Sequence, residues 1–187
     1  ENIGVKIEIE DIVDISKKLG LNDKTGIEIN VPAEVSGGVP DPQRKIITTK
    51  FLLKQLLNRT IREYIMEDKV ISEEEIVEII DEIISWTEYE TPLTRAEVVR
   101  RLIAFGIEPE MRLPGEREGL ADKIKYTYLN QAGWNIADTL NVTIGQGQSA
   151  YTPIQMANYI ATISNGGYHN KVTLIDSIRD YNNVALL

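Results

Sequence analysis

Residues 145–157 read Gly-Gln-Gly-Gln-Ser-Ala-Tyr-Thr-Pro-Ile-Gln-Met-Ala, and this stretch decides how the C-terminal half of the chain folds. Thr152 is a good N-cap residue, Pro153 suits the first helical position, and Gln155 can complete a capping box. We therefore expect a helix that begins at Pro153 and ends before Asn165-Gly166-Gly167. Its predicted buried face consists of Ile154, Ala157, Ile160, Ala161 and Ile163.

The glycines of this stretch also fit a dinucleotide-binding fingerprint, because Gly145 to Ala150 matches G-x-G-x-x-A and Asp176 is a later acid. In that fingerprint the helix begins within the glycines. A helix that began at Gly147 would carry Pro153 in its second turn, where proline removes a backbone hydrogen bond. Asp176 also lies about thirty residues beyond Gly145, whereas the fingerprint places its acid after about twenty. Dinucleotide binding at Gly145–Ala150 therefore stays the weaker alternative.

The composition of the 187 residues narrows the possible functions. The formal net charge of -9 repels phosphate backbones, so nucleic acid is not an expected partner. The absence of cysteine excludes thiolate zinc sites, and the single histidine, His169, excludes a site built on two imidazoles. No apolar run approaches the roughly 18 residues of a membrane span. The start at Glu1 without methionine suggests a processed product or a piece of a longer protein.

Hydrophobic periodicity and capping residues predict a mainly α-helical fold with a few short strands. Ser72 with Glu75, and Thr94 with Glu97, each match the S/T-x-x-E capping box that starts a helix. Helices are predicted over residues 8–19, 43–66, 72–84, 94–105 and 123–131. Extended runs are predicted over residues 139–144 and 171–178.

Two groups of residues match parts of catalytic motifs, and neither match is complete. Lys24-Thr25-Gly26 reproduces the K-T-G triad of serine penicillin-recognising enzymes, but it lies in a turn-rich stretch instead of on a strand. The S-x-x-K tetrad of these enzymes is absent, because none of the seven serines is followed by lysine at the third position. Ser149 follows Gly147 as in a nucleophile elbow, but Tyr151 stands where the elbow needs glycine. His169 could act as the base for Ser149, but this pairing is suggested by composition alone and by no motif.

Four stretches together resemble the transpeptidase domain of penicillin-binding proteins. Residues 145–157 resemble its I-G-Q-G-x-x-x-x-T-P-x-Q-x-A segment, and residues 160–167 resemble the A-x-x-A-N-G-G that follows. Residues 133–141 resemble its W-x-x-G-D-T-L-N approach, with Ala137 in place of the usual glycine. Residues 19–29 are similar to its F-G-L-G-E-K-T-G-I-D-L loop, which is structural in the family.

The resemblance covers residues 9–40 and 126–178 and implies a particular place in the family. It implies an internal fragment of an elongation-type class B enzyme from a Gram-positive, clostridium-like bacterium, with the helical part of a serine β-lactamase-like α/β fold. The fragment would lie between the second and third catalytic motifs, S-x-N and K-T-G, so that the nucleophilic serine falls outside it. Residues 1–42 and 106–187 would then be the transpeptidase-domain fragment, and residues 43–105 an inserted helical bundle.

The function that the resemblance implies is cross-linking of peptidoglycan, in which the serine of S-x-x-K attacks the penultimate D-alanine of a stem peptide. The chain alone would be inactive, and stem peptides and β-lactams would bind through the parent domain. That parent would lie on the extracytoplasmic face of the bacterial membrane, anchored by an N-terminal helix that this sequence lacks. Alternatively, the bundle 43–105 is a helical interaction module for cell-wall elongation proteins. We expect no catalytic, cofactor-binding or metal-binding residue within the chain.

Overall fold

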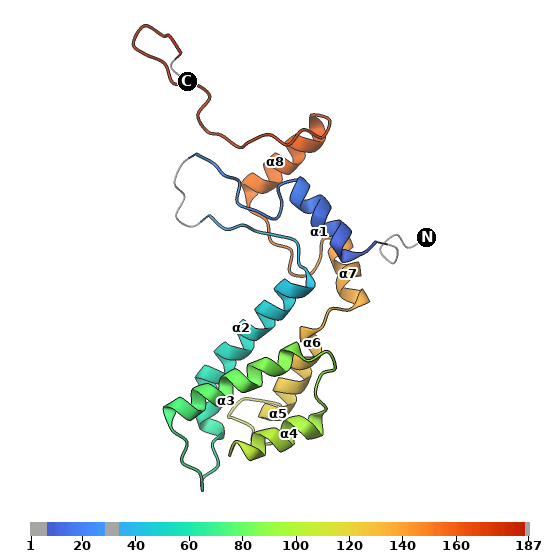
Figure 1. Ribbon diagram of the computed structural model, residues 1–187, viewed down its shortest axis with the longest axis vertical. Coiled ribbons are helices and arrows are strands. Elements are labelled where there is room, and N and C mark those ends of the chain that lie inside the picture. The colour runs from blue at the N-terminus through green and yellow to red at the C-terminus, as the bar shows by residue number, and fades with distance from the viewer. Residues whose placement is uncertain (1–6, 29–33, 186–187) are drawn as a thin grey trace. The chain divides into compact units, whose positions relative to one another are not determined.

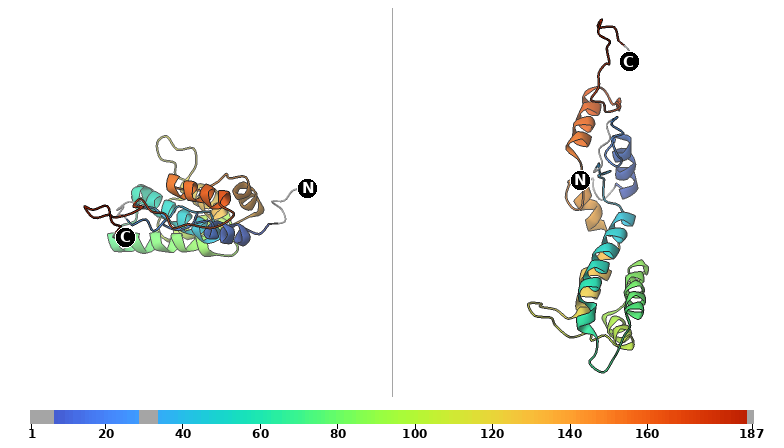
Figure 2. Two further views of the ribbon diagram at one scale, coloured as in Figure 1. Left: turned by 90° about the horizontal axis from the view of Figure 1, so that it is seen from above. Right: turned by 90° about the vertical axis from the view of Figure 1, so that its left-hand side faces the viewer.

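The computed structural model describes residues 7–28 and 34–185, and helices form most of it (Figure 1). The chain divides into two compact units: unit 1 comprises Glu1–Asp41 and Ile136–Leu187, and unit 2 comprises Pro42–Asn135. Figure 2 shows the helices of each unit in two further views. In the described ranges β-structure is confined to isolated bridges, so the predicted mainly α-helical fold is confirmed.

Unit 2 is built from helices that carry aliphatic residues at spacings of three and four. α2 (Pro42–Thr60) continues into the short helix η2 (Ile61–Tyr64), and α3 (Glu73–Ser85) continues into η3 (Trp86–Glu88). After α4 (Arg95–Ala104), a continuous helical stretch consists of α5 (Leu120–Asp122), the π-helical η4 (Lys123–Leu129) and α6 (Asn130–Ala132). These elements confirm the helices predicted between residues 43 and 131.

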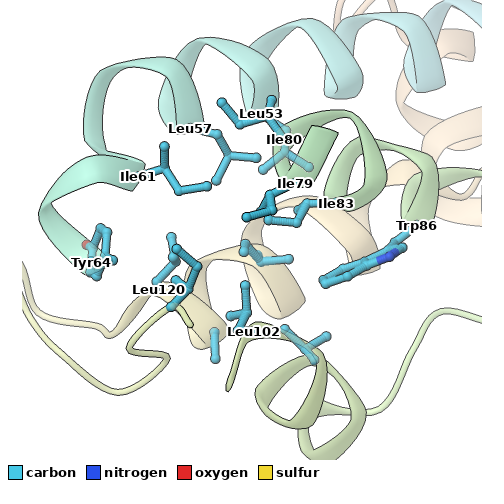
Figure 3. Packing of buried hydrophobic residues seen from close by; sticks show 14 of the residues in the cluster. Leu53, Leu57, Ile61, Tyr64, Ile79, Ile80, Ile83, Trp86, Leu102 and Leu120 are labelled. Atoms are coloured by element: carbon cyan, nitrogen blue, oxygen red, sulfur yellow. The ribbon is translucent and has the colours of Figure 1, made fainter. Parts of the chain in front are cut away.

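The core of unit 2 is a cluster of buried, mostly aliphatic side chains, with Tyr64 and Trp86 at opposite ends of the cluster (Figure 3). Leu53 from α2, Ile83 from α3 and Leu102 from α4 are each fully buried in it. Burying an aliphatic side chain of this size contributes about 1.5–3 kcal/mol. The helices of unit 2 are therefore held together by packing of their apolar faces.

Residues beyond α4 complete the same core. Leu120, Ile124 and Leu129 are almost fully buried and belong to the cluster formed by α2, α3 and α4. The compact unit thus extends to Asn135, whereas the predicted inserted bundle ends at residue 105. A compact unit is defined by contacts and an insertion by comparison with relatives, so the insertion over residues 43–105 stays a prediction.

Side-chain caps start α3 and α4, and they differ in completeness. At α3, Ser72 Oγ accepts from the Glu75 amide (3.2 Å) and Glu75 Oε2 accepts from the Ser72 amide (2.8 Å), which confirms the predicted capping box. At α4, Thr94 Oγ1 accepts from the Glu97 amide (3.2 Å). The Glu97 carboxylate instead accepts from two arginines of its own helix, so the second predicted box is only half formed.

The described part of unit 1 contains α1 (Ile9–Lys18), α7 (Ile136–Thr143) and α8 (Pro153–Ser164). α1 confirms the helix predicted over residues 8–19, and α8 begins at the predicted residue. Among the described residues of unit 1, the segments between these helices have no regular structure beyond isolated bridges. In the part of the chain that the structure describes, no helix combines the length and apolarity that crossing a membrane requires.

Both predicted extended runs are wrong. Residues 139–143 belong to α7, because Gly145 supplies a C-terminal cap that outweighs the β-propensity of Val142 and Thr143. Residues 171–178 form no strand, since no neighbouring backbone pairs with them within the described ranges.

The predicted buried face of α8 is also wrong. The residues of α8 that are buried are Gln155 and Thr162, each with 1% of its surface exposed. Ile160 and Ile163, which were expected inside, are 54% and 55% exposed. The prediction failed because the polar side of α8 receives hydrogen-bonded backbone from another segment of unit 1, which periodicity cannot reveal.

Candidate functional site

A glutamine at the start of α8 joins two segments that are far apart in the sequence. Gln155 Nε2 donates to the carbonyl oxygens of Asp23 (2.7 Å) and Ser36 (2.6 Å). Gln155 Oε1 accepts from the amide (2.8 Å) and the hydroxyl (3.1 Å) of Thr152, which is the N-cap of the helix. We call Asp23, Ser36, Thr152 and Gln155 the Gln155 junction. It satisfies both ends of a buried amide, as burial of polar groups requires.

Backbone hydrogen bonds extend the Gln155 junction on both sides. The Gly38 amide donates to Ala150 O (2.6 Å), and the Ala150 amide donates to Gly38 O (3.2 Å). Asn22 Oδ1 accepts from the Val39 amide (3.1 Å), and both of these residues are buried. The described residues between 22 and 39 are thus held against the chain that leads into α8.

The chemistry of the Gln155 junction requires an amide side chain. A glutamate could accept from Thr152 equally well, as Glu75 does at the start of α3. It could not donate to the carbonyl oxygens of Asp23 and Ser36, because an ionised carboxylate only accepts. From the sequence, Gln155 was predicted to serve the cap alone, and this second role was not predicted. The available signal was the choice of glutamine over glutamate at the third position of a capping box.

Lys24-Thr25-Gly26 lies in an irregular loop segment and not on a strand. The amide and hydroxyl of Thr25 both donate to Glu34 Oε1, at 2.8 and 2.7 Å. Both hydrogen bonds lower the pKa of Glu34, and the bond from the Thr25 hydroxyl has the larger effect. Lys24 is exposed, and Gly26 has a φ of 68°. The Thr25–Glu34 hydrogen bonds join two parts of one loop. This arrangement differs from the strand on which K-T-G forms one wall of an active site.

The glycine loop, residues 145–150, caps the C-terminus of α7 and then leads to α8. The Gly145 amide donates to Val142 O (3.0 Å) and the Gln146 amide donates to Asn141 O (2.8 Å). With Gly145 at a φ of 73°, these two bonds form a Schellman motif at the C-terminus of α7. The carbonyl end of a helix carries partial negative charge, which repels phosphate. This geometry disagrees with dinucleotide binding at Gly145–Ala150.

The two other candidates, Ser149 and His169, make separate contacts. His169 Nε2 lies 3.0 Å from Asn158 Nδ2 on α8, and the ring packs against Gly20. In residues 7–28 and 34–185, no hydrogen bond joins Ser149 to His169. Over the same ranges, no group of three His, Asp or Glu side chains could hold a metal ion.

The segment that follows α8 is anchored to the loop by one carboxylate. Glu28 Oε1 accepts from Thr173 Oγ1 (2.5 Å) and from the amides of Leu174 and Ile175 (both 2.8 Å). The Thr173 hydroxyl, the backbone amide of Glu28 itself and the amides of Ile175 and Leu174 lower the pKa of Glu28 to about 2. The carboxylate is therefore charged at neutral pH and fixes residues 173–175 without a strand.

Residues 68–185, which are more than half of the chain, match the model of the penicillin-binding protein transpeptidase domain. The chain belongs to this family. Penicillin-binding protein 2A of Bacillus subtilis (strain 168) is 46% identical over 43 residues, which are 23% of this chain and 6% of that protein. The match therefore spans only a small part of its penicillin-binding relative. No solved structure matches the chain.

The matched range places one half of the Gln155 junction inside the penicillin-binding protein transpeptidase domain. Thr152 and Gln155 lie within it, whereas Asp23 and Ser36 precede Asp68, where the match begins. Residues 19–29, whose sequence resembles a structural loop of the family, lie outside the matched range. The match also runs through residues 68–105, which were predicted to belong to an insertion.

Proposed function

We propose that this chain is a structural, non-catalytic segment of a peptidoglycan D,D-transpeptidase, lying between its S-x-N and K-T-G motifs. The observation that supports this most is the Gln155 junction, which fastens the Lys24-Thr25-Gly26 loop to the start of α8. Both segments resemble the same family in the same order. A contact of this kind positions chain segments and offers no group for nucleophilic attack.

Several residues of the chain favour a structural role over a catalytic one. The amide and hydroxyl of Thr25 donate to Glu34, and Lys24 lies exposed on an irregular loop. No serine of the chain is followed by lysine at the third position. An acyl-transfer enzyme needs a nucleophile with a base within hydrogen-bond reach. We infer that the serine and its lysine are supplied by other parts of the parent protein.

The proposal includes the setting of the whole enzyme. The parent is an elongation-type class B enzyme, whose serine attacks the penultimate D-alanine of a stem peptide and is acylated by β-lactams. It acts on the extracytoplasmic face of the bacterial membrane, to which it is anchored. In this setting residues 1–42 and 106–187 support the cleft, and residues 43–105 form an inserted bundle.

Fluorescent penicillin tests the proposed role. The 187-residue chain is expected to remain unlabelled on a denaturing gel, because it holds no S-x-x-K serine. The longer protein, with its flanking sequence, is expected to become covalently labelled, and an excess of unlabelled penicillin should abolish that label. The matched control is Ser149→Ala in the 187-residue chain, because Ser149 is the serine that partly matches a nucleophile elbow. Covalent labelling of the 187-residue chain that disappears in Ser149→Ala would refute a purely structural role.

A further inference from the structure

Unit 2 carries a groove that its own core does not fill. The groove has a volume of about 470 Å³ and lies between α3 and the C-terminal end of α4. Its apolar lining includes Ile71, Ile79 and Phe105. Phe105 is held in place by stacking on Trp86, with ring centroids 6.4 Å apart. The apolar surface of the groove is therefore fixed by the packed core behind it.

One wall of the groove is acidic. Glu75, Glu78 and Glu82 line it, and their spacings of three and four place them on one face of α3. α3 contains six acidic residues and no basic residue. Its other acidic face is neutralised within unit 2, because Glu73 pairs with Arg62 and Asp81 pairs with Lys54. Within the described ranges, the glutamates on the groove-facing side make no ion pair as close as these.

Two observations show how little of this negative charge is compensated at the groove. Glu82 accepts from Trp86 Nε1 (3.0 Å) and lies 3.8 Å from an Arg101 nitrogen, so it is partly occupied. Glu78 is exposed and makes no ion pair among the residues that the structure describes. The C-terminus of α4 adds the partial negative charge of the helix dipole beside Phe105, although the carbonyl groups of Arg101, Leu102 and Ile103 accept backbone hydrogen bonds. The groove thus combines an apolar surface with a negative rim.

We propose that this groove docks a basic amphipathic segment of another protein, with an aliphatic or aromatic side chain between Ile79 and Phe105 and a lysine or arginine against Glu78. The choice of partner follows from charge complementarity, because a negative rim attracts cations and excludes acidic segments. The apolar surface selects a protein segment over a nucleic acid, whose phosphates the rim repels. The docking is independent of the role proposed for unit 1.

The test uses two fluorescein-labelled peptides on the full 187-residue chain. One is an 18-residue amphipathic helix of leucine and lysine, and the other has the same pattern with glutamate in place of lysine. The leucine–lysine peptide is expected to bind, with amide chemical-shift changes centred on Ile79 and Phe105. Binding should weaken as salt is raised, because exposed charges are screened. The leucine–glutamate peptide is expected not to bind.

Two charge-reversal variants on α3 distinguish binding in the groove from non-specific electrostatic attraction to the helix. Glu78→Lys is expected to weaken binding at least about tenfold. Glu74→Lys makes the same change in net charge on α3 outside the groove, and it should weaken binding less than about twofold. Equal weakening by both variants, equal binding of the leucine–glutamate peptide, or shift changes away from Ile79 and Phe105 would each overturn the proposal.

Discussion

Replacing Gln155 with glutamate is expected to destabilise unit 1 by about 3–5 kcal/mol, the range seen when a buried charge loses its partner. Gln155 is 1% exposed, so the new carboxylate would be buried. It would still accept from Thr152 and keep the helix cap. In the native chain the carbonyl oxygens of Asp23 and Ser36 accept hydrogen bonds from Gln155 at 2.7 and 2.6 Å. The new carboxylate would face these two oxygens and would have no proton to donate to them. Repulsion and lost hydrogen bonds therefore act together.

Hydrogen exchange at the Gly38 and Ala150 amides measures this effect, because these amides bond across the two segments. Their exchange rates should rise more than about a hundredfold in Gln155→Glu. The matched control is Glu75→Gln, which makes the reverse change in the exposed capping box of α3. An amide oxygen still accepts there, so the loss should stay within about 1 kcal/mol. Unchanged exchange in Gln155→Glu would mean that Gln155 does not hold the segments together.

Replacing Gly37 with alanine is expected to open the same contact through sterics, at a cost of about 2–5 kcal/mol. Gly37 has a φ of 61°, which disfavours any residue with a Cβ. An added Cβ would also lie 2.5 Å from Gln155 Oε1 and 2.8 Å from Ala150 O. The Ala150 carbonyl oxygen belongs to the backbone bridge and cannot move without breaking it.

Gly26→Ala is the matched control for Gly37→Ala. Gly26 has a similar φ of 68° in the same loop, but a Cβ there would meet no atom within 4 Å. This control should show only the backbone cost, which is about 1–2 kcal/mol for a left-handed residue. Urea unfolding followed at the Gly38 and Ala150 amides would compare the two variants. If both variants lost the same stability, the close contact at Gly37 would contribute nothing.

Local features of the fold were predictable from the sequence. Ser72 with Glu75, and Thr152 with Gln155, fix helix starts through bonds that span three residues. Such bonds depend on neighbouring side chains only, so periodicity and capping rules located α3 and α8 correctly. The Schellman cap at Gly145 is equally local, but the β-branched residues before it favoured a strand in the sequence analysis. That error came from giving β-propensity more weight than the cap.

The contacts that define the candidate site were not predictable in this way. Gln155 reaches Asp23 and Ser36 over 132 and 119 residues, and no pattern along the chain reports such a pairing. Hydrophobic periodicity instead placed Ile160 and Ile163 inside, where the structure leaves them about half exposed. A helix can bury its polar side when backbone carbonyls satisfy it, and that condition is set by tertiary structure.

The most direct test of the Gln155 junction is an NMR measurement on the unsubstituted chain. The two side-chain amide protons of Gln155 are expected to exchange slowly with water and to show cross-peaks to protons of residues 23–24 and 36–37. Slow exchange follows because both protons are donated to buried carbonyl oxygens. If these protons exchanged as fast as those of a free glutamine and showed no such cross-peaks, the loop and α8 would not be joined. The structural role proposed for the segment would then lose its main support.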